Sequence, residues 1–327
     1  MEQIKIDRKF LSVKEIECLT VEEKEQYFND LKEACMICPF KKTTTEWIKK
    51  CISYIAPLLR SYKLEVYGEE NLPKDNPAVF ICNHSNSHDF FTIHEVFRLV
   101  GRKVTPFGAS DCLNKVTKLL FQLGDVTLID RSDKDSSVNG LLEFSRKILD
   151  GKDGVIFSEG TWNLHPTKLM QPIKAGGTQV ALITGKVMIP TIFEYFEVPM
   201  ECKKESQLYG KCVVSFGKPI IVNCQDNLIE KTKEVQTIME NMRRDIRERF
   251  GSEYYSFSAD DEGIRCYLNH TYLKKFKAFG FRYDSEHEFR FLLERGKDNE
   301  YCINENGEFV QGITRNDKKN CWIMNMR

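Results

Sequence analysis

The feature that most constrains the fold is an alternation of short apolar runs with longer amphipathic stretches between residues 63 and 222. Helical patterns lie between several of the runs, near residues 88–99, 114–123, 137–149 and 174–185. Because strands that alternate with helices favour parallel pairing, the sequence predicts an α/β domain with a mixed, largely parallel central sheet flanked by helices. The apolar runs are Leu64–Tyr67, Ala78–Cys82, Val104–Phe107, Val126–Ile129, Val155–Phe157, Met188–Phe193 and Cys212–Val222.

The composition changes on either side of this alternating region, and we expect three segments. Residues 1–62 are charged and predict an N-terminal helical segment, which includes an amphipathic helix from Thr45 to Tyr62. Residues 63–250 form the predicted main domain, whose last element is a long charged helix, Asn227–Phe250, with Asp226 as its cap. Residues 251–327 predict a small C-terminal α+β extension of unassigned role, with a turn at residues 304–307 between two short strands.

The overall composition removes several classes of protein. The chain has 327 residues, and 48 Lys and Arg balance 48 Asp and Glu, so its net charge gives no argument for nucleic-acid binding. Its 12 cysteines lack regular spacing and follow no apolar leader, so we expect reduced thiols in a cytoplasmic protein. The Cys35-x-x-Cys38 pair lacks the second pair of a zinc ribbon. No apolar run reaches about 18 residues, so we expect no transmembrane helix.

Polar residues follow the strand predicted at Ala78–Cys82, at the edge where α/β sheets usually place their sites. His84 stands in the loop and Asp89 in the first turn of the next helix, so the carboxylate can fold back against the imidazole. Such a contact fixes the tautomer of a general-base histidine and stabilises the imidazolium. Two alternatives are open: the pair satisfies a turn, or His84, His88 and Asp89 bind a metal. The Ser-Asn-Ser between the histidines favours a loop over a helical metal-binding face.

Three further strand regions carry residues with site chemistry. Glu159-Gly160-Thr161 follows one strand, and its glycine permits close backbone approach to a ligand. Asp130-Arg131 follows another, and the guanidinium can grip a phosphate or carboxylate with two hydrogen bonds. Ile189-Pro190 lies within a third strand. Taken singly, each has a simpler interpretation, namely an ordinary turn, a surface ion pair and a core strand with an edge proline.

These four features, in this order and spacing, resemble the glycerolipid acyltransferases that share a His-x4-Asp motif, among them the lysophosphatidate acyltransferases; the resemblance covers about residues 63–222. It implies a single-step transfer of a fatty-acyl group from the thioester of coenzyme A or acyl carrier protein to a lipid hydroxyl. In that reaction His84 is the general base and Asp89 orients it, without a metal or redox cofactor. The resemblance also implies that the matching residues Arg131, Glu159, Gly160 and Thr161 hold the acceptor phosphate and that Pro190 shapes the acyl or acceptor pocket. Trp162, which follows Thr161, is a further candidate for substrate contact.

Three departures from the family pattern bear on the acceptor. Trp162 stands where an arginine usually follows the threonine, Asn86 stands where a serine is usual, and the spacing from Gly124 to Arg131 is one residue longer. The general base is untouched by these changes. We expect a 1-acylglycerol-3-phosphate-like acceptor, with a non-phosphate acceptor such as a glycolipid or amino-lipid as the alternative. A catalytically inactive protein that binds lipid or acyl carrier is the alternative from another class.

The helix predicted from Thr45 to Tyr62 has a marked apolar face with cations beside it. A face of this kind predicts peripheral contact with the inner face of a membrane, where the cations meet anionic headgroups. The alternative is a helix packed on the main domain. The expected partners are thus an acyl donor, a lipid acceptor and a membrane surface, with no nucleic acid. The apolar face carries Trp47, Ile52, Ile55 and Leu59.

Overall fold

The computed structural model describes residues 10–37, 46–59, 62–84, 88–110, 113, 115–160, 163, 169–197, 210–250, 301–303 and 309–311. Its strands are β1 (Lys63–Tyr67), β2 (Val79–Cys82), β3 (Val104–Ala109), β4 (Thr127–Ile129), β5 (Asp153–Phe157), β6 (Met188–Glu197), β7 (Gly210–Phe216), β8 (Tyr301–Ile303) and β9 (Phe309–Gln311). Its helices are α1 (Val13–Glu17), α2 (Val21–Ile37), α3 (Glu46–Leu59), α4 (Asp89–Leu99), α5 (Lys115–Leu123), α6 (Lys134–Leu149), α7 (Gly176–Thr184) and α8 (Leu228–Phe250), with a short 3-10 turn, η1, at Glu69–Asn71.

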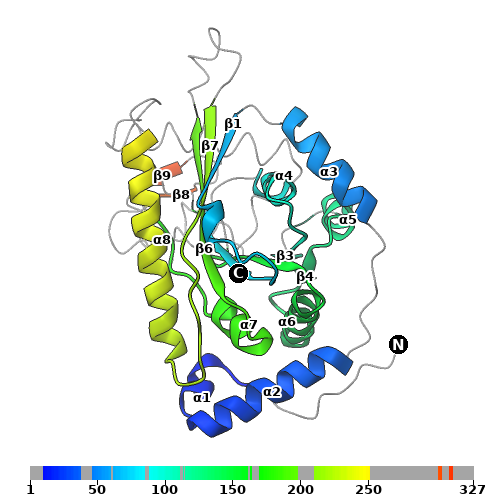
Figure 1. The fold of residues 1–327 in the computed structure, drawn as a ribbon, viewed down its shortest axis with the longest axis vertical. Coiled ribbons are helices and arrows are strands. Elements are labelled where there is room, and N and C mark those ends of the chain that lie inside the picture. The colour runs from blue at the N-terminus through cyan, green and yellow to red at the C-terminus, as the bar shows by residue number, and fades with distance from the viewer. Residues whose placement is uncertain are drawn as a thin grey trace.

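Seven strands form one sheet in the order β1-β7-β6-β2-β5-β3-β4. In Figure 1, β1, β7 and β6 lie together, and β3 lies beside β4. The strands from β6 to β4 run parallel to one another, whereas β7 pairs antiparallel with β6, and β1 pairs parallel with β7. The carboxyl ends of β2, β5 and β4 therefore meet at one edge of the sheet. The predicted mixed, largely parallel sheet flanked by helices is confirmed.

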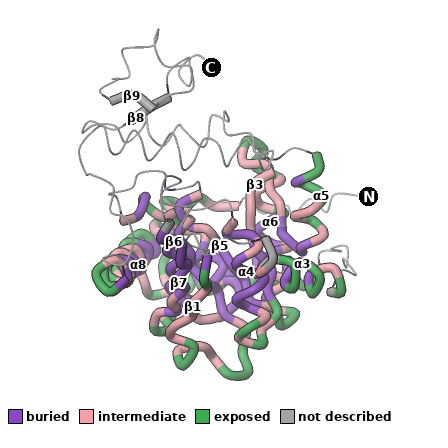
Figure 2. The backbone as a smooth tube through the Cα atoms, turned by 90° about the horizontal axis from the view of Figure 1, so that it is seen from above, coloured by how far each residue is buried: buried purple, intermediate pink, exposed green. Residues whose placement is uncertain are grey.

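The central strands separate two apolar layers, because successive side chains of a strand point to opposite faces. On β2, Val79 and Ile81 pack in the layer that contains α6, α7 and α8, whereas Phe80 packs with Phe97 of α4 in the other layer. The sheet is mostly buried, and the helices expose their outer faces (Figure 2). Ile16 of α1 also belongs to the first layer, so the N-terminal helices share a core with the sheet.

The helix ends differ from the expectations where side chains cap the backbone. Helix α6 begins earlier than predicted, at Lys134, because the Asp133 side chain accepts a hydrogen bond from the N–H of Asp135. The predicted cap of α8 was wrong. Asn227 Oδ1 accepts N–H bonds from the first helical turn, while the Asp226 carboxylate accepts one from the preceding loop.

The C-terminal segment is described at two short strands. β8 and β9 pair antiparallel, which confirms the pair of strands expected around residues 304–307. The other residues of the predicted 251–327 extension lie outside the described part of the chain. The three-segment division at residues 62 and 250 stays a prediction.

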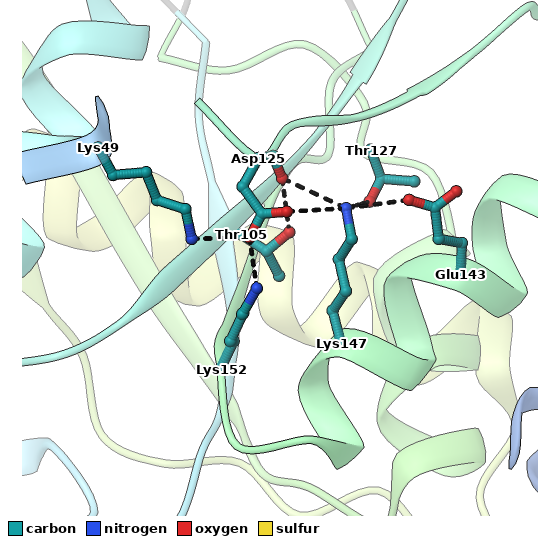
Figure 3. Close-up of polar contacts among 7 residues, drawn as sticks. All are labelled: Lys49, Thr105, Asp125, Thr127, Glu143, Lys147 and Lys152. Atoms are coloured by element: carbon teal, nitrogen blue, oxygen red, sulfur yellow. Dashed lines mark hydrogen bonds and ion pairs between the residues drawn. The ribbon is translucent and has the colours of Figure 1, made fainter. Parts of the chain in front are cut away.

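A buried ionic cluster fastens α3 to the rest of the domain (Figure 3). The Asp125 carboxylate accepts hydrogen bonds from Nζ of Lys49 on α3 at 2.8 Å and from Nζ of Lys152 at 2.6 Å. Nζ of Lys147 on α6 lies 3.1 Å from the same carboxylate. Burial alone would raise the pKa of Asp125, but Lys147, Lys49 and Lys152 outweigh it and hold the pKa far below its usual value.

Helix α3 has an inner face and an outer face. Ile52 is 6% exposed and packs with Phe90 and Val126, so it faces the domain and not the outside. Trp47 and Ile55 point outward, at 67% and 46% exposure. The helix thus packs on the domain and also presents apolar side chains to the surroundings, and membrane contact stays a prediction. Among the described residues, none of the helices combines the length and apolarity needed to cross a bilayer.

Candidate active site

Three of the predicted site residues lie in loops at the carboxyl edge of the parallel strands. His84 follows β2, Glu159 follows β5 and Arg131 follows β4. β2 pairs directly with β5, and β3 lies between β5 and β4, so the three loops lie along the same edge of the sheet. The sheet therefore assembles residues that are far apart in the sequence.

The imidazole of His84 contacts the carboxylate of Asp89. His84 Nδ1 lies 2.7 Å from Asp89 Oδ2, where Asp89 begins α4. The side chain of His84 is 21% exposed and that of Asp89 is 1% exposed. An ionised carboxylate accepts hydrogen bonds and donates none, so Nδ1 carries the proton and Nε2 is the basic nitrogen. The contact expected from the sequence is thus present, and its geometry suits a general base with an orienting carboxylate.

The loop of His84 is fixed by neighbours on both sides. The ring stacks on Phe157 at the end of β5, with 4.2 Å between ring centroids. Asn83 exchanges two hydrogen bonds with the backbone of Phe193 on β6, at 2.9 and 2.7 Å. The backbone N–H of Asn163 donates to the carbonyl of His84. These contacts hold the imidazole in one place before any substrate binds.

Glu159 lies beneath the site and has no exposed surface. Its Oε1 accepts the backbone N–H of His84 at 2.9 Å, and its Oε2 accepts that of Gln171 at 2.7 Å. Burial raises the pKa of Glu159 to about 7, against the lowering effect of these N–H groups and of Arg243. The Glu159 carboxylate thus joins two loops of the protein. Its contact with a substrate stays a prediction.

Two cationic side chains lie at Gly160, in the loop that follows β5. The Arg131 guanidinium donates a hydrogen bond to the carbonyl oxygen of Gly160 at 2.6 Å. Gly160 has a φ of +74°, in the region that favours glycine, and a Cβ placed there would lie 3.0 Å from Nζ of Lys174. Two positively charged side chains, Arg131 and Lys174, therefore lie at Gly160. This arrangement is suited to binding an anionic group.

The remaining predicted site residues divide into two groups. Thr161 and Trp162 lie outside the described residues. Pro190 is buried in β6, a central strand and not an edge. Its missing N–H costs no ladder bond, because the antiparallel pairing of β6 with β7 begins at Thr191.

Two observations concern other chemistry at this edge. Within the described ranges, no group of three or more His, Cys, Asp and Glu side chains is arranged to hold a metal. Cys82, at the end of β2, is fully buried, and this burial together with the nearby Asp89 raises the pKa of its thiol well above the usual value. A buried, protonated thiol is a poor nucleophile.

Sequence reasoning missed Tyr195 of β6. Its hydroxyl donates a 2.7 Å hydrogen bond to Asp89 Oδ1, the carboxylate oxygen that does not face His84. Tyr195 lies in the mostly apolar run Ile192-Phe193-Glu194-Tyr195-Phe196, so the sequence pattern indicates a core strand and gives no sign that Asp89 is its partner.

The chain is similar to known acyltransferases. Residues 63–194 match the acyltransferase family model. A 1-acyl-sn-glycerol-3-phosphate acyltransferase from Saccharomyces cerevisiae is 24% identical over 226 residues, which are 65% of this chain and 71% of that protein. The alpha form of 1-acyl-sn-glycerol-3-phosphate acyltransferase from Bos taurus is 28% identical over 165 residues, which are 50% of this chain.

The chain spans 55% of the length of that bovine relative. Among solved structures, the 1-acyl-sn-glycerophosphate acyltransferase of Thermotoga maritima aligns with a TM-score of 0.47 and 18% identity, over 68% of this chain and 90% of that one.

The family match covers residues 63–194, so this part of the α/β sheet resembles an acyltransferase domain. Within that family, the chain resembles the lysophosphatidate acyltransferases.

Proposed function

We propose that this protein transfers a fatty-acyl group from acyl-CoA or acyl carrier protein to the hydroxyl of a 1-acylglycerol-3-phosphate-like acceptor. The observation that carries the proposal is the contact of His84 with Asp89 at the sheet edge, together with the two cationic side chains at Gly160. An acyl acceptor needs a base at its hydroxyl, and a phosphorylated acceptor also needs positive charge nearby.

The proposed reaction has one covalent step. The acceptor hydroxyl gives its proton to Nε2 of His84 as its oxygen attacks the thioester carbonyl carbon. The ester C–O bond forms, the C–S bond breaks, and the imidazolium returns the proton to the thiolate that leaves. Asp89 stabilises the imidazolium while it exists.

The acceptor phosphate is assigned to Arg131 and Lys174. Arg131 is the stronger candidate, because a guanidinium stays charged and can bind two phosphate oxygens at once. The hydrogen bond from Arg131 to the carbonyl oxygen of Gly160 directs the guanidinium toward the loop that follows β5. Trp162 stands where the family usually has a further arginine, so the phosphate would depend on fewer cations than is usual.

Incubation of the purified protein with radiolabelled acyl-CoA or acyl carrier protein and a panel of lipid acceptors tests the proposal. We expect labelled phosphatidate-type product from a 1-acylglycerol-3-phosphate. Labelled product from glycolipid or amino-lipid acceptors alone would move the assignment to a non-phosphate acceptor. Binding of donor and acceptor without any labelled product would make the chain a binding protein.

We also propose peripheral contact with the inner face of the membrane in a cytoplasmic protein. The support is the outer face of α3, where Trp47, Tyr54 and Ile55 are exposed. The neighbouring helix α5 exposes Val116 and Leu119, and both helices contribute to one small apolar cluster. Exposed apolar side chains on adjacent helices suit the boundary between headgroups and acyl chains.

A further inference from the structure

The carboxylate of Asp89 is held from two sides. Oδ2 faces Nδ1 of His84 at 2.7 Å, and Oδ1 accepts the hydroxyl of Tyr195 at 2.7 Å. Asp89 begins α4, whereas Tyr195 lies on β6, so the second bond ties the helix to the sheet. With a side-chain exposure of 1%, Asp89 depends on the protein for its hydrogen bonds.

The direction of these hydrogen bonds follows from the chemistry of the groups. The ionised Asp89 carboxylate accepts only, so the single hydroxyl proton of Tyr195 goes to Oδ1. The Tyr195 oxygen also lies 3.0 Å from Oγ1 of Thr92, and that oxygen lies 2.5 Å from the hydroxyl of Tyr62. With Tyr195 committed to Asp89, the hydroxyl of Thr92 acts as donor toward Tyr195 or toward the carbonyl of His88, 3.1 Å away.

Tyr195 remains a donor over the working pH range. Burial, and then the charge of Asp89, raises the pKa of the Tyr195 hydroxyl well above its usual value. The phenol ring also packs edge-on against Tyr62, with 5.4 Å between ring centroids, which limits its rotation. A fixed donor that cannot lose its proton imposes one orientation on the carboxylate it faces.

We propose that Tyr195 is a positioning residue for acyl transfer, which acts on His84 through Asp89. The hydroxyl keeps Oδ2 of Asp89 directed at Nδ1 and draws negative charge toward Oδ1. Less negative charge then faces the imidazole, so the imidazolium is less stabilised. The neutral, basic form of His84 therefore persists to lower pH. The inference rests on the proposed function, since it assigns Tyr195 a task in that reaction.

Other titratable groups lie near His84, Asp89 and Tyr195, and an experiment has to distinguish their effects from that of Tyr195. Cys82 of β2, Cys212 of β7 and Tyr62 interact electrostatically with Asp89 or Tyr195, and the buried Glu159 interacts with Asp89. Glu159 has its own pKa of about 7, so a pH–rate profile alone mixes its titration with that of His84. A signal from the His84 ring is therefore needed beside the kinetics.

The substitution Tyr195→Phe removes the hydroxyl and keeps the ring. We expect kcat to fall about tenfold with both KM values unchanged, as for the loss of a hydrogen bond to a charged group. We also expect the acid limb of the kcat/KM profile to move up by about half a pH unit. Tyr67→Phe is the matched control, because Tyr67 donates a 2.8 Å bond to the Glu65 carboxylate on β1. It should leave kinetics and pH profile as in the wild type.

NMR of the ligand-free protein, labelled with carbon-13 in the histidine rings, measures the protonation of the His84 ring in the absence of turnover. The chain has 6 histidines, and the signal missing from His84→Gln identifies this one. The titration midpoint of His84 should rise by about half a pH unit in Tyr195→Phe and stay fixed in Tyr67→Phe. An unchanged midpoint in folded Tyr195→Phe overturns the inference.

Two further results keep the inference separate from its premise. If the wild type transfers no acyl group to any acceptor, the proposed function fails, and the NMR midpoint still decides whether Tyr195 acts on His84. If Tyr195→Phe does not fold, uniform labelling with 3-fluorotyrosine replaces it. The more acidic phenol donates more strongly, so the His84 midpoint should fall; a midpoint that rises or stays fixed contradicts the inference.

Discussion

Arg131 and Gly160 are joined by a 2.6 Å hydrogen bond from the guanidinium to the carbonyl oxygen, although 29 residues separate them. The bond connects the loop after β4 with the loop after β5. It holds the guanidinium beside the loop that carries Glu159 and Gly160. The position of Arg131 therefore leads directly to a prediction about the acceptor.

Arg131→Ala should raise the acceptor KM at least tenfold if the acceptor carries a phosphate, because a hydrogen bond to a charged group contributes about 1.5–3 kcal/mol. The donor KM should barely change. Steady-state kinetics with each substrate varied in turn gives both values. Arg146→Ala, at an arginine whose ion pair with Asp150 lies on the surface of α6, is the control. An unaltered acceptor KM in Arg131→Ala, with a raised one in Trp162→Ala, would exclude the phosphate assignment.

Asp125→Asn should destabilise the protein by about 3 kcal/mol, because it leaves the buried Lys49 ammonium without its anion. Asparagine is suitable because Asp125 has a φ of +64°, which this residue type tolerates. Urea denaturation measures the loss. Asp150→Asn, at a carboxylate that is 48% exposed, should cost below about 1 kcal/mol. Equal losses in the two variants would show that the cluster in Figure 3 does not stabilise the fold.

Glu159 should make stability depend on pH. Its pKa is raised to about 7 in the folded protein, so the folded state binds a proton more tightly than the unfolded state. Its contribution is thus fully present below the unfolded value of 4.5 and is lost as pH rises through about 7. Relative to the wild type, Glu159→Gln should gain about 2 kcal/mol between pH 5 and pH 8. Denaturation curves at both values check this, and a pH-independent difference would contradict it.

Trp47→Glu should weaken binding to vesicles that contain anionic lipid, because it places a charge on the exposed apolar face of α3. Liposome flotation measures the bound fraction, and circular dichroism checks the fold. Ile221→Glu changes another exposed apolar residue, at 65% exposure and outside α3 and α5, and should bind as the wild type does. Undiminished flotation of Trp47→Glu would favour a helix that serves packing alone.

The sequence was sufficient for the sheet and for the convergence of the site loops. Apolar runs with helical patterns between them define parallel strands, and the polar residues after β2, β4 and β5 then meet at one edge. The contact between His84 and Asp89 followed from their spacing around the start of α4.

Burial and distant partners could not be deduced in the same way. The sequence does not distinguish a carboxylate that follows a strand and faces solvent from one that is buried beneath the site, as Glu159 is. Lys49 was expected among the cations that meet anionic headgroups, but it is buried, and its partner Asp125 is 76 positions away. The hydroxyl of Tyr195 meets Asp89 through the packing of β6 against α4, across 106 positions. Such contacts depend on the assembled layers.

The most direct test of general-base catalysis by His84 is the turnover of His84→Ala with saturating acyl thioester and acceptor. Removal of a positioned general base typically costs about 10²–10⁴ in rate, so we expect kcat to fall by that factor while circular dichroism and the melting temperature show a folded protein. Asp89→Asn should lose a similar amount or less, because it orients the base and does not take the proton itself. Wild-type turnover by a folded His84→Ala protein would contradict the role of His84 as the general base.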